Sequence, residues 1–243
     1  ALSFDLGPTL ASWMERHGRA AYRAIRRGDE ISRERRGGHG NAIAQSYNHS
    51  ILPLLSPRDR ELQIAWGIED FVYRFGRRPE GIWMPECAAD DDTLEAIAAA
   101  GLKFTIVAAD QGRFKGPGAD ARAAGPFIWR GREPTLAIFR FDRALSGEIA
   151  FGDALADGAT LADRVTEAAL ALEPGAAFLV VTDGETFGHH KKTGAAELAK
   201  ALMLLERRGD IMLANPGEYL ASHAAAGSFE MNGPTAWSCP HAI

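Results

Sequence analysis

The amino-acid sequence predicts an α/β fold built around a parallel sheet that is buried on both faces. Short apolar runs of strand length alternate along the chain with longer segments of helical periodicity. The short runs are apolar at successive positions, which is typical of strands covered by helices on both sides. The chain has 243 residues, enough to bury a substantial core as a single domain.

The clearest predicted helix covers residues 56–76. Ser56 can cap its first turn, Pro57 fits the first helical position, and Gly76 supplies a stop. Between these residues, apolar side chains recur at the spacing of one helix face. The same spacing predicts further helices over residues 9–27, 92–100, 160–173 and 194–208.

The predicted strands occupy the apolar runs between these helices. They cover residues 82–84, 104–107, 136–141, 178–181 and 211–213, with a weaker candidate at 42–44. The segment 111–132 is rich in Gly, Ala and Arg, and we expect it to be a long loop or a short excursion. No stretch resembles a linker, so residues 1–243 are predicted to form one domain. Both ends look like cuts, so we expect this domain to be a fragment of a longer protein.

The composition argues against several classes of protein. The formal net charge is −5, so no basic bias favours nucleic acid or an anionic membrane as a partner. Cys87 and Cys239 are far apart in sequence and suggest neither a disulfide framework nor a metal-ligand pair, so the cytoplasm is the expected compartment. No apolar run is long enough to span a membrane, and the first residues do not resemble a signal peptide.

An acidic residue lies at or just past the end of each of four consecutive predicted strands. These residues are Glu86, Asp110, Asp142 and Asp183. The carboxyl edge of a parallel sheet carries the functional site in α/β barrels and open α/β sheets, because the βα loops converge there. Any one of these acids could instead cap the following helix. Four in succession favour a shared acidic cleft.

Two of the acids lie in sequences that add detail. Pro85 restricts the backbone just before Glu86, and Trp83 could either stack on a sugar ring or pack in the core. Asp183 is followed by Glu185 two residues later. A pair of carboxylates is the requirement for glycoside cleavage, in which one group donates a proton and the other attacks or activates water.

Four segments carry a resemblance to glycoside hydrolase family 57. Residues 81–86 read G-I-W-M-P-E, similar to the family's G-x-W-x-P-E motif, whose glutamate is the nucleophile. Residues 183–188 read D-G-E-T-F-G, similar to its D-x-E-x-F-G motif, whose aspartate is the acid/base. Residues 40–54, which include His49, resemble the family's substrate-site G…H-x-I-L-P-L motif, and residues 215–220 resemble its P-S-E-Y-L segment.

The details resemble best a less studied branch of the family. Its opening F-x-x-G-P-T-L-x-S-W corresponds to residues 4–13, its acid motif T-D-G-E-T-[FY]-G-H-H to residues 182–190, and its late W-S-C-x-H to residues 237–241. The family's first motif, H-x-H-x-x-P, should lie upstream of Phe4 and is absent from this sequence. The resemblance therefore implies a (β/α)7-type barrel that is incomplete because the first strand motif is missing.

The resemblance also implies an activity: a retaining hydrolase or transglycosylase that acts on α-glucans such as starch or glycogen. Activities in the family include α-amylase, 4-α-glucanotransferase and branching enzyme, with no metal and no cofactor. Glu86 would be the nucleophile and Asp183 the acid/base. The expected substrate-binding residues are His49, Trp83, Glu185, His189, His190, Asp110, Asp142 and Trp237. The expected partner is an oligo- or polysaccharide.

Two other functions stay open. A metal-dependent polysaccharide deacetylase or an α-mannosidase-like enzyme on a related barrel would use Asp183, His189 and His190 as ligands, although their spacing within one loop does not match a usual three-ligand set. A non-catalytic glycan-binding barrel is the other alternative.

Overall fold

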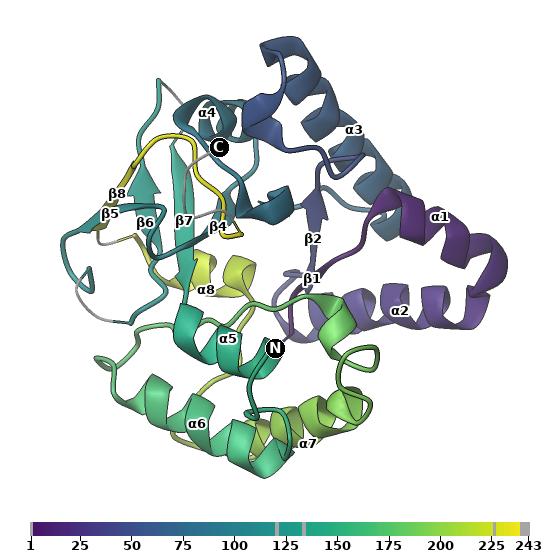
Figure 1. Cartoon of the computed structure of the whole chain (residues 1–243), viewed down its shortest axis with the longest axis vertical. Helices are drawn as coiled ribbons and strands as arrows, with labels where there is room; N and C mark the ends of the chain where they lie inside the picture. The colour runs from purple at the N-terminus through teal and green to yellow at the C-terminus, as the bar shows by residue number, and fades with distance from the viewer. Residues whose placement is uncertain (1, 120–121, 133–134, 226, 239–243) are drawn as a thin grey trace.

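The computed structural model describes residues 2–119, 122–132, 135–225 and 227–238. Within these ranges the chain forms an eight-stranded sheet surrounded by helices (Figure 1). The strands are β1 Phe4–Asp5, β2 Ala42–Gln45, β3 Gly81–Trp83, β4 Phe104–Ala108, β5 Gly112–Lys115, β6 Phe127–Trp129, β7 Leu136–Phe141 and β8 Gly227–Met231. The helices are α1 Pro8–His17, α2 Arg19–Arg35, α3 Pro57–Phe75, α4 Asp91–Ala99, α5 Arg143–Ala150, α6 Gly158–Leu170, α7 Gly194–Glu206 and α8 Pro216–Ser222.

The strands follow the order β1-β2-β3-β4-β7-β6-β8-β5. The first five are parallel to one another, as expected for helix-linked strands. At the other end β6 is antiparallel to β7, and β5 is antiparallel to β8. In the described part of the chain no pairing joins β5 to β1, so the sheet is open. The α/β class is confirmed, and an open sheet fits the expected incomplete barrel.

Two predicted strands are wrong. Residues 178–181 and 211–213 belong to no strand. The cause for 178–181 lies at the edge of β7, where β6 pairs with residues 136–138 and the Arg140 N–H donates to the Ala124 carbonyl. Among the described residues of β7 and its end, the backbone N–H that donates to the segment 178–181 is that of Asp142, which reaches the Leu179 carbonyl at 2.7 Å. In the segment 211–213, the Leu213 carbonyl accepts from the Arg36 side chain.

The Gly-, Ala- and Arg-rich segment 111–132 contains two strands rather than a loop alone. Its β5 and β6 join β8, which the sequence analysis did not predict. Phe114 packs its ring 4.8 Å from that of Phe127 and 4.9 Å from that of Phe229, one aromatic from each of these strands. The buried Arg140 donates to the carbonyls of Gly118, Ala119 and Ala123, which holds the intervening loop on β7.

The predicted helices are present with shifted ends, but the N-terminal one is divided. Gly18 ends α1, its N–H donating to the Met14 carbonyl at 2.8 Å, and directly precedes α2. For α3, Ser56 accepts from the Asp59 N–H and Gly76 adopts the left-handed conformation, as the sequence predicts. Helices α5 and α8 were not predicted. No helix in the described ranges is long and apolar enough to cross a membrane.

The helices bury two clusters of apolar side chains. The larger lies between the sheet and α3 and α4. The smaller joins α5, α6 and α7, which Figure 1 shows together at one end of the molecule. The parallel strands therefore sit in a packed frame, and the positions of their ends are set by it.

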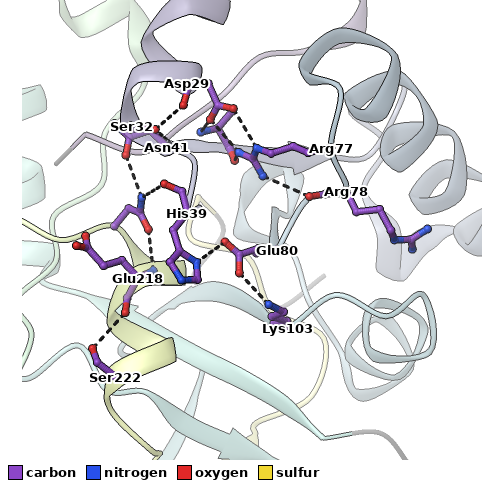
Figure 2. Close-up of polar contacts among 12 residues, drawn as sticks. Asp29, Ser32, His39, Asn41, Arg77, Arg78, Glu80, Lys103, Glu218 and Ser222 are labelled. Atoms are coloured by element: carbon purple, nitrogen blue, oxygen red, sulfur yellow. Dashed lines mark hydrogen bonds and ion pairs between the residues drawn. The ribbon is translucent and has the colours of Figure 1, made fainter. Parts of the chain in front are cut away.

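A polar network fixes the amino ends of the parallel strands (Figure 2). Buried Asp29 of α2 accepts from the Ala42 N–H and forms a two-pronged ion pair with Arg77, at 2.8 and 3.0 Å. Glu80, just before β3, accepts from Lys103, just before β4, at 2.9 Å. These polar side chains at the amino ends of the strands pair with one another, which indicates a structural role. A functional site is therefore expected at the carboxyl ends.

Candidate active site

The carboxyl ends of the parallel strands bring predicted site residues together. His49 follows β2, Glu86 follows β3, and Asp110 follows β4. Asp183 comes from the extended segment after α6, and its charge interacts with that of Glu86. The two predicted catalytic carboxyl groups therefore lie close enough for their charges to interact.

Glu86 lies on a short 3-10 turn, Pro85–Cys87, with an unusual backbone. Glu86 has φ 55° and Cys87 has φ 51°, the left-handed region that non-glycine residues rarely adopt. Such residues cost about 1–3 kcal/mol each and persist only where surrounding contacts impose them. The Cys87 N–H donates to the Met84 carbonyl at 2.8 Å. The strained turn sets the direction in which the Glu86 side chain leaves the backbone.

Gln111 forms hydrogen bonds that hold the Glu86 turn. The sequence analysis did not predict this residue. Its side chain is almost fully buried, accepts from the Ala108 N–H at 2.8 Å, and donates to the Cys87 carbonyl at 2.6 Å. It also donates to the Thr235 hydroxyl at 3.2 Å. One side chain thus joins the end of β4, the Glu86 turn and the C-terminal segment. A single glutamine in a loop carries no sequence signal for this role.

Trp237 lies against Glu86. Its backbone N–H donates to the Glu86 carbonyl at 3.0 Å, and its indole Nε1 donates to Glu86 Oε2 at 3.2 Å. The indole packs edge-on against Trp83, with ring centroids 5.1 Å apart, and against Phe141 at 5.9 Å. Trp83 is buried and supports Trp237 from the core. Residues 239–241, the rest of the predicted W-S-C-x-H segment, lie outside the described residues.

The surroundings shift the pKa values of Glu86 and Asp183 in opposite directions. Hydrogen bonding from Ser238 and Trp237 and the nearby His49 hold the pKa of Glu86 below its ordinary value, despite partial burial. His49 has φ 55°, and its Nε2 lies 3.8 Å from Glu86 Oε1. The pKa of Asp183 is raised, because protein displaces water from it and the charges of Glu185 and Glu86 oppose its ionisation. Glu86 is thus favoured as a carboxylate and Asp183 as an acid.

The Asp183 loop also positions both histidines. The Glu185 carbonyl accepts from the N–H groups of His189 and His190, and the two rings lie 4.9 Å apart. The charge of His190 partly offsets the rise in the Asp183 pKa. In the described ranges, no three His, Cys, Asp or Glu side chains are arranged to hold a metal ion, so Asp183, His189 and His190 do not form a ligand cluster.

A further carboxylate, Asp5, was missed. It ends β1 at the open edge of the sheet, and its charge interacts with those of His49, Asp183 and Glu185. Asp5 is exposed as a residue, but neighbouring protein displaces water from its carboxyl group and raises its pKa to about 6. The strand is two residues long, too short to form an apolar run in the sequence.

The remaining predicted residues have structural contacts. Asp142 caps α5 by accepting from the Leu145 N–H at 2.7 Å and pairs with Arg122. Asp110 pairs with Arg143 at 2.6 Å, and Arg143 also donates to the Trp237 carbonyl at 3.1 Å. The capping alternative thus describes the contacts of Asp142, and Asp110 helps to anchor Trp237.

Comparisons with known proteins agree on the family and fold. The sequence model of the family described as Glycosyl hydrolase family 57 matches residues 33–232. A probable 1,4-alpha-glucan branching enzyme of Mycobacterium tuberculosis is 41% identical over 59 residues, which are 24% of this chain and 11% of that enzyme.

Solved structures share the fold at low identity. The 4-alpha-glucanotransferase from Thermococcus litoralis superposes with a TM-score of 0.73 at 15% identity, over 96% of this chain and 36% of that one. A GH57-type branching enzyme from Pyrococcus horikoshii gives 0.69 at 21% identity, over 93% of this chain and 52% of that one. The chain therefore spans only part of the length of the relatives that it matches.

Proposed function

The chain belongs to glycosyl hydrolase family 57, and from that premise we propose that it cleaves or transfers α-glucosidic bonds of starch- or glycogen-like glucans with retention of configuration. Glu86 is the nucleophile and Asp183 the acid/base. The branching enzyme and the glucanotransferase that the chain resembles support α-glucan as the substrate class.

The observation that carries the proposal is the opposite tuning of two carboxyl groups that interact across the carboxyl edge of the sheet. Hydrogen bonds stabilise the ionised form of Glu86, whereas burial and like charges favour the protonated form of Asp183. Two carboxyls pushed apart in pKa are what a retaining glycosidase requires.

The reaction proceeds in two displacements. A carboxylate oxygen of Glu86 attacks the anomeric carbon while Asp183 gives its proton to the departing glycosidic oxygen, leaving a glycosyl ester on Glu86. Asp183, now ionised, takes a proton from an incoming hydroxyl, which attacks the anomeric carbon and releases Glu86. If the hydroxyl is water the result is hydrolysis, and if it belongs to another sugar the result is transfer.

The strained turn contributes to this chemistry. Gln111 and Trp237 hold Glu86 in place before substrate arrives, so little reorganisation is needed to reach the transition state. His49 offers positive charge or a hydrogen bond at the other oxygen of Glu86. Together these contacts keep the nucleophile ionised and aimed.

The test is product analysis after incubating the complete protein with maltoheptaose. We expect shorter or longer maltooligosaccharides from the wild type and none from Glu86→Gln or Asp183→Asn. Asp157→Asn is the matched control, because Asp157 is a half-exposed helix cap on α6 and the variant should keep full activity. Undiminished turnover by either active-site variant would contradict the proposal.

A further inference from the structure

Two large aromatic side chains lie exposed beside the proposed active site. Tyr47 follows β2, and Trp66 lies on the facing side of α3. Their exposed fractions are 37% and 47%, and their ring centroids are 6.0 Å apart at an interplanar angle of 74°. An exposed pair of amphipathic rings is more informative than single exposed apolar residues, because folding alone would favour burying both.

The backbone around the pair is fixed. The Tyr47 N–H donates to the Gln63 carbonyl at 3.1 Å, and the Asn48 N–H donates to the Gln63 side chain at 2.8 Å. Helix α3 also approaches β2 so closely at Gly67 that an added Cβ would overlap the Gln45 carbonyl oxygen. The backbone that carries the two rings is therefore held in place, so binding would cost little ordering of the backbone.

The aromatic pair Tyr47 and Trp66 lies near Glu86, the proposed nucleophile. Tyr47 precedes His49 by two residues, so their Cα atoms are at most about 7.6 Å apart. His49 Nε2 in turn lies 3.8 Å from Glu86 Oε1. The Tyr47 backbone therefore lies within the length of a few sugar units from Glu86.

We propose that Tyr47 and Trp66 form a platform that binds glucose units of the α-glucan beyond the bond being cleaved. The proposal rests on the function proposed above. A pyranose ring has an apolar face that stacks on an aromatic ring and hydroxyls that remain in water or bond to the Tyr47 hydroxyl. Two rings set nearly at right angles form a corner, which suits a curved glucan chain better than a flat protein surface.

The test measures binding by calorimetry in the inactive Glu86→Gln form of the complete protein, with maltoheptaose and maltotriose. We expect Trp66→Ala and Tyr47→Ala each to weaken maltoheptaose binding about tenfold, as removal of a central aromatic contact does, with little effect on maltotriose. Trp13→Ala on α1 and Tyr73→Ala farther along α3 are matched controls, because their rings are exposed by 57% and 70%. Both controls should bind maltoheptaose like the parent.

Three results would overturn the platform. They are unchanged maltoheptaose binding in both folded platform variants, equal losses for the long and short sugars, and equal losses in the Trp13 control. Failure of the proposed function is distinguishable, since it appears as no turnover of maltoheptaose by the wild type or as undiminished turnover by the Glu86→Gln parent, whatever the platform variants bind.

Discussion

Replacing Gln111 with leucine should both destabilise the fold and disable Glu86. Leucine is similar in size but removes the acceptor for the Ala108 N–H and the donor for the Cys87 carbonyl, both in buried surroundings. Each buried polar group left without its partner costs about 1–3 kcal/mol, so the free energy of unfolding should fall by about 2–6 kcal/mol. The strained turn would also relax, and displacement of Glu86 by about 1 Å should lower kcat about a hundredfold.

The assay for Gln111→Leu combines urea unfolding with kcat measured at a temperature where the variant is folded. Ser32→Ala is the matched control. Buried Ser32 donates to the Asp29 carbonyl and accepts from the Asn41 N–H, both at 2.8 Å, at the opposite end of the sheet (Figure 2). It should lose stability with kcat unchanged. If Gln111→Leu loses stability but keeps the wild-type kcat, the reasoning about the Glu86 turn is refuted.

Three further predictions follow from the site and its frame. Trp237→Phe keeps an aromatic ring but removes the donor to Glu86, so the acid limb of the kcat/KM profile should move to higher pH; an unmoved limb would exclude this role. The pKa of Asp5 is about 6 in the folded protein against an ordinary 3.8, so the stability that its neutral form contributes is full below pH 3.8 and is lost as pH rises through 6. Asp5→Asn should therefore raise the free energy of unfolding at pH 7.5 by about 1 kcal/mol, after allowance for solvent screening. At pH 4.5 the gain should be smaller, and equal gains at both pH values would contradict this reasoning. Gly67→Ala places a Cβ against the Gln45 carbonyl and should lower the free energy of unfolding by about 1–3 kcal/mol in urea titrations, and a neutral effect would show that α3 can shift.

The central strands could be predicted because each is a short apolar run between helical segments. The run 136–141 coincides with β7, and the run before Glu86 differs from β3 by one residue at each end. The segment 178–181 is also an apolar run, yet it forms no strand, because β6 and the Ala124 backbone take the neighbouring edge of β7. Strand identity depends on the partner, which local composition does not specify.

The sequence signal for the candidate site was the acidic residues that come after apolar runs. Glu86 follows the parallel strand β3, so its place at the carboxyl edge could be expected from strand order. Asp183 follows an apolar segment that forms no strand, so the same reasoning does not account for its position. Asp142 shows the limit of that pattern, because its contacts are those of a helix cap. Asp5 and Gln111 act through long-range contacts, one from a two-residue strand and one from a loop, and neither leaves a local pattern.

The most direct test of the central claim is to trap the glycosyl-enzyme intermediate. An α-maltooligosaccharyl fluoride needs no acid to release its leaving group, so Asp183→Asn should form the ester and then hydrolyse it slowly. Peptide mass spectrometry should find the added sugar on Glu86. A sugar on another residue, or release of fluoride with no covalent adduct, would contradict the assignment of Glu86 as the nucleophile.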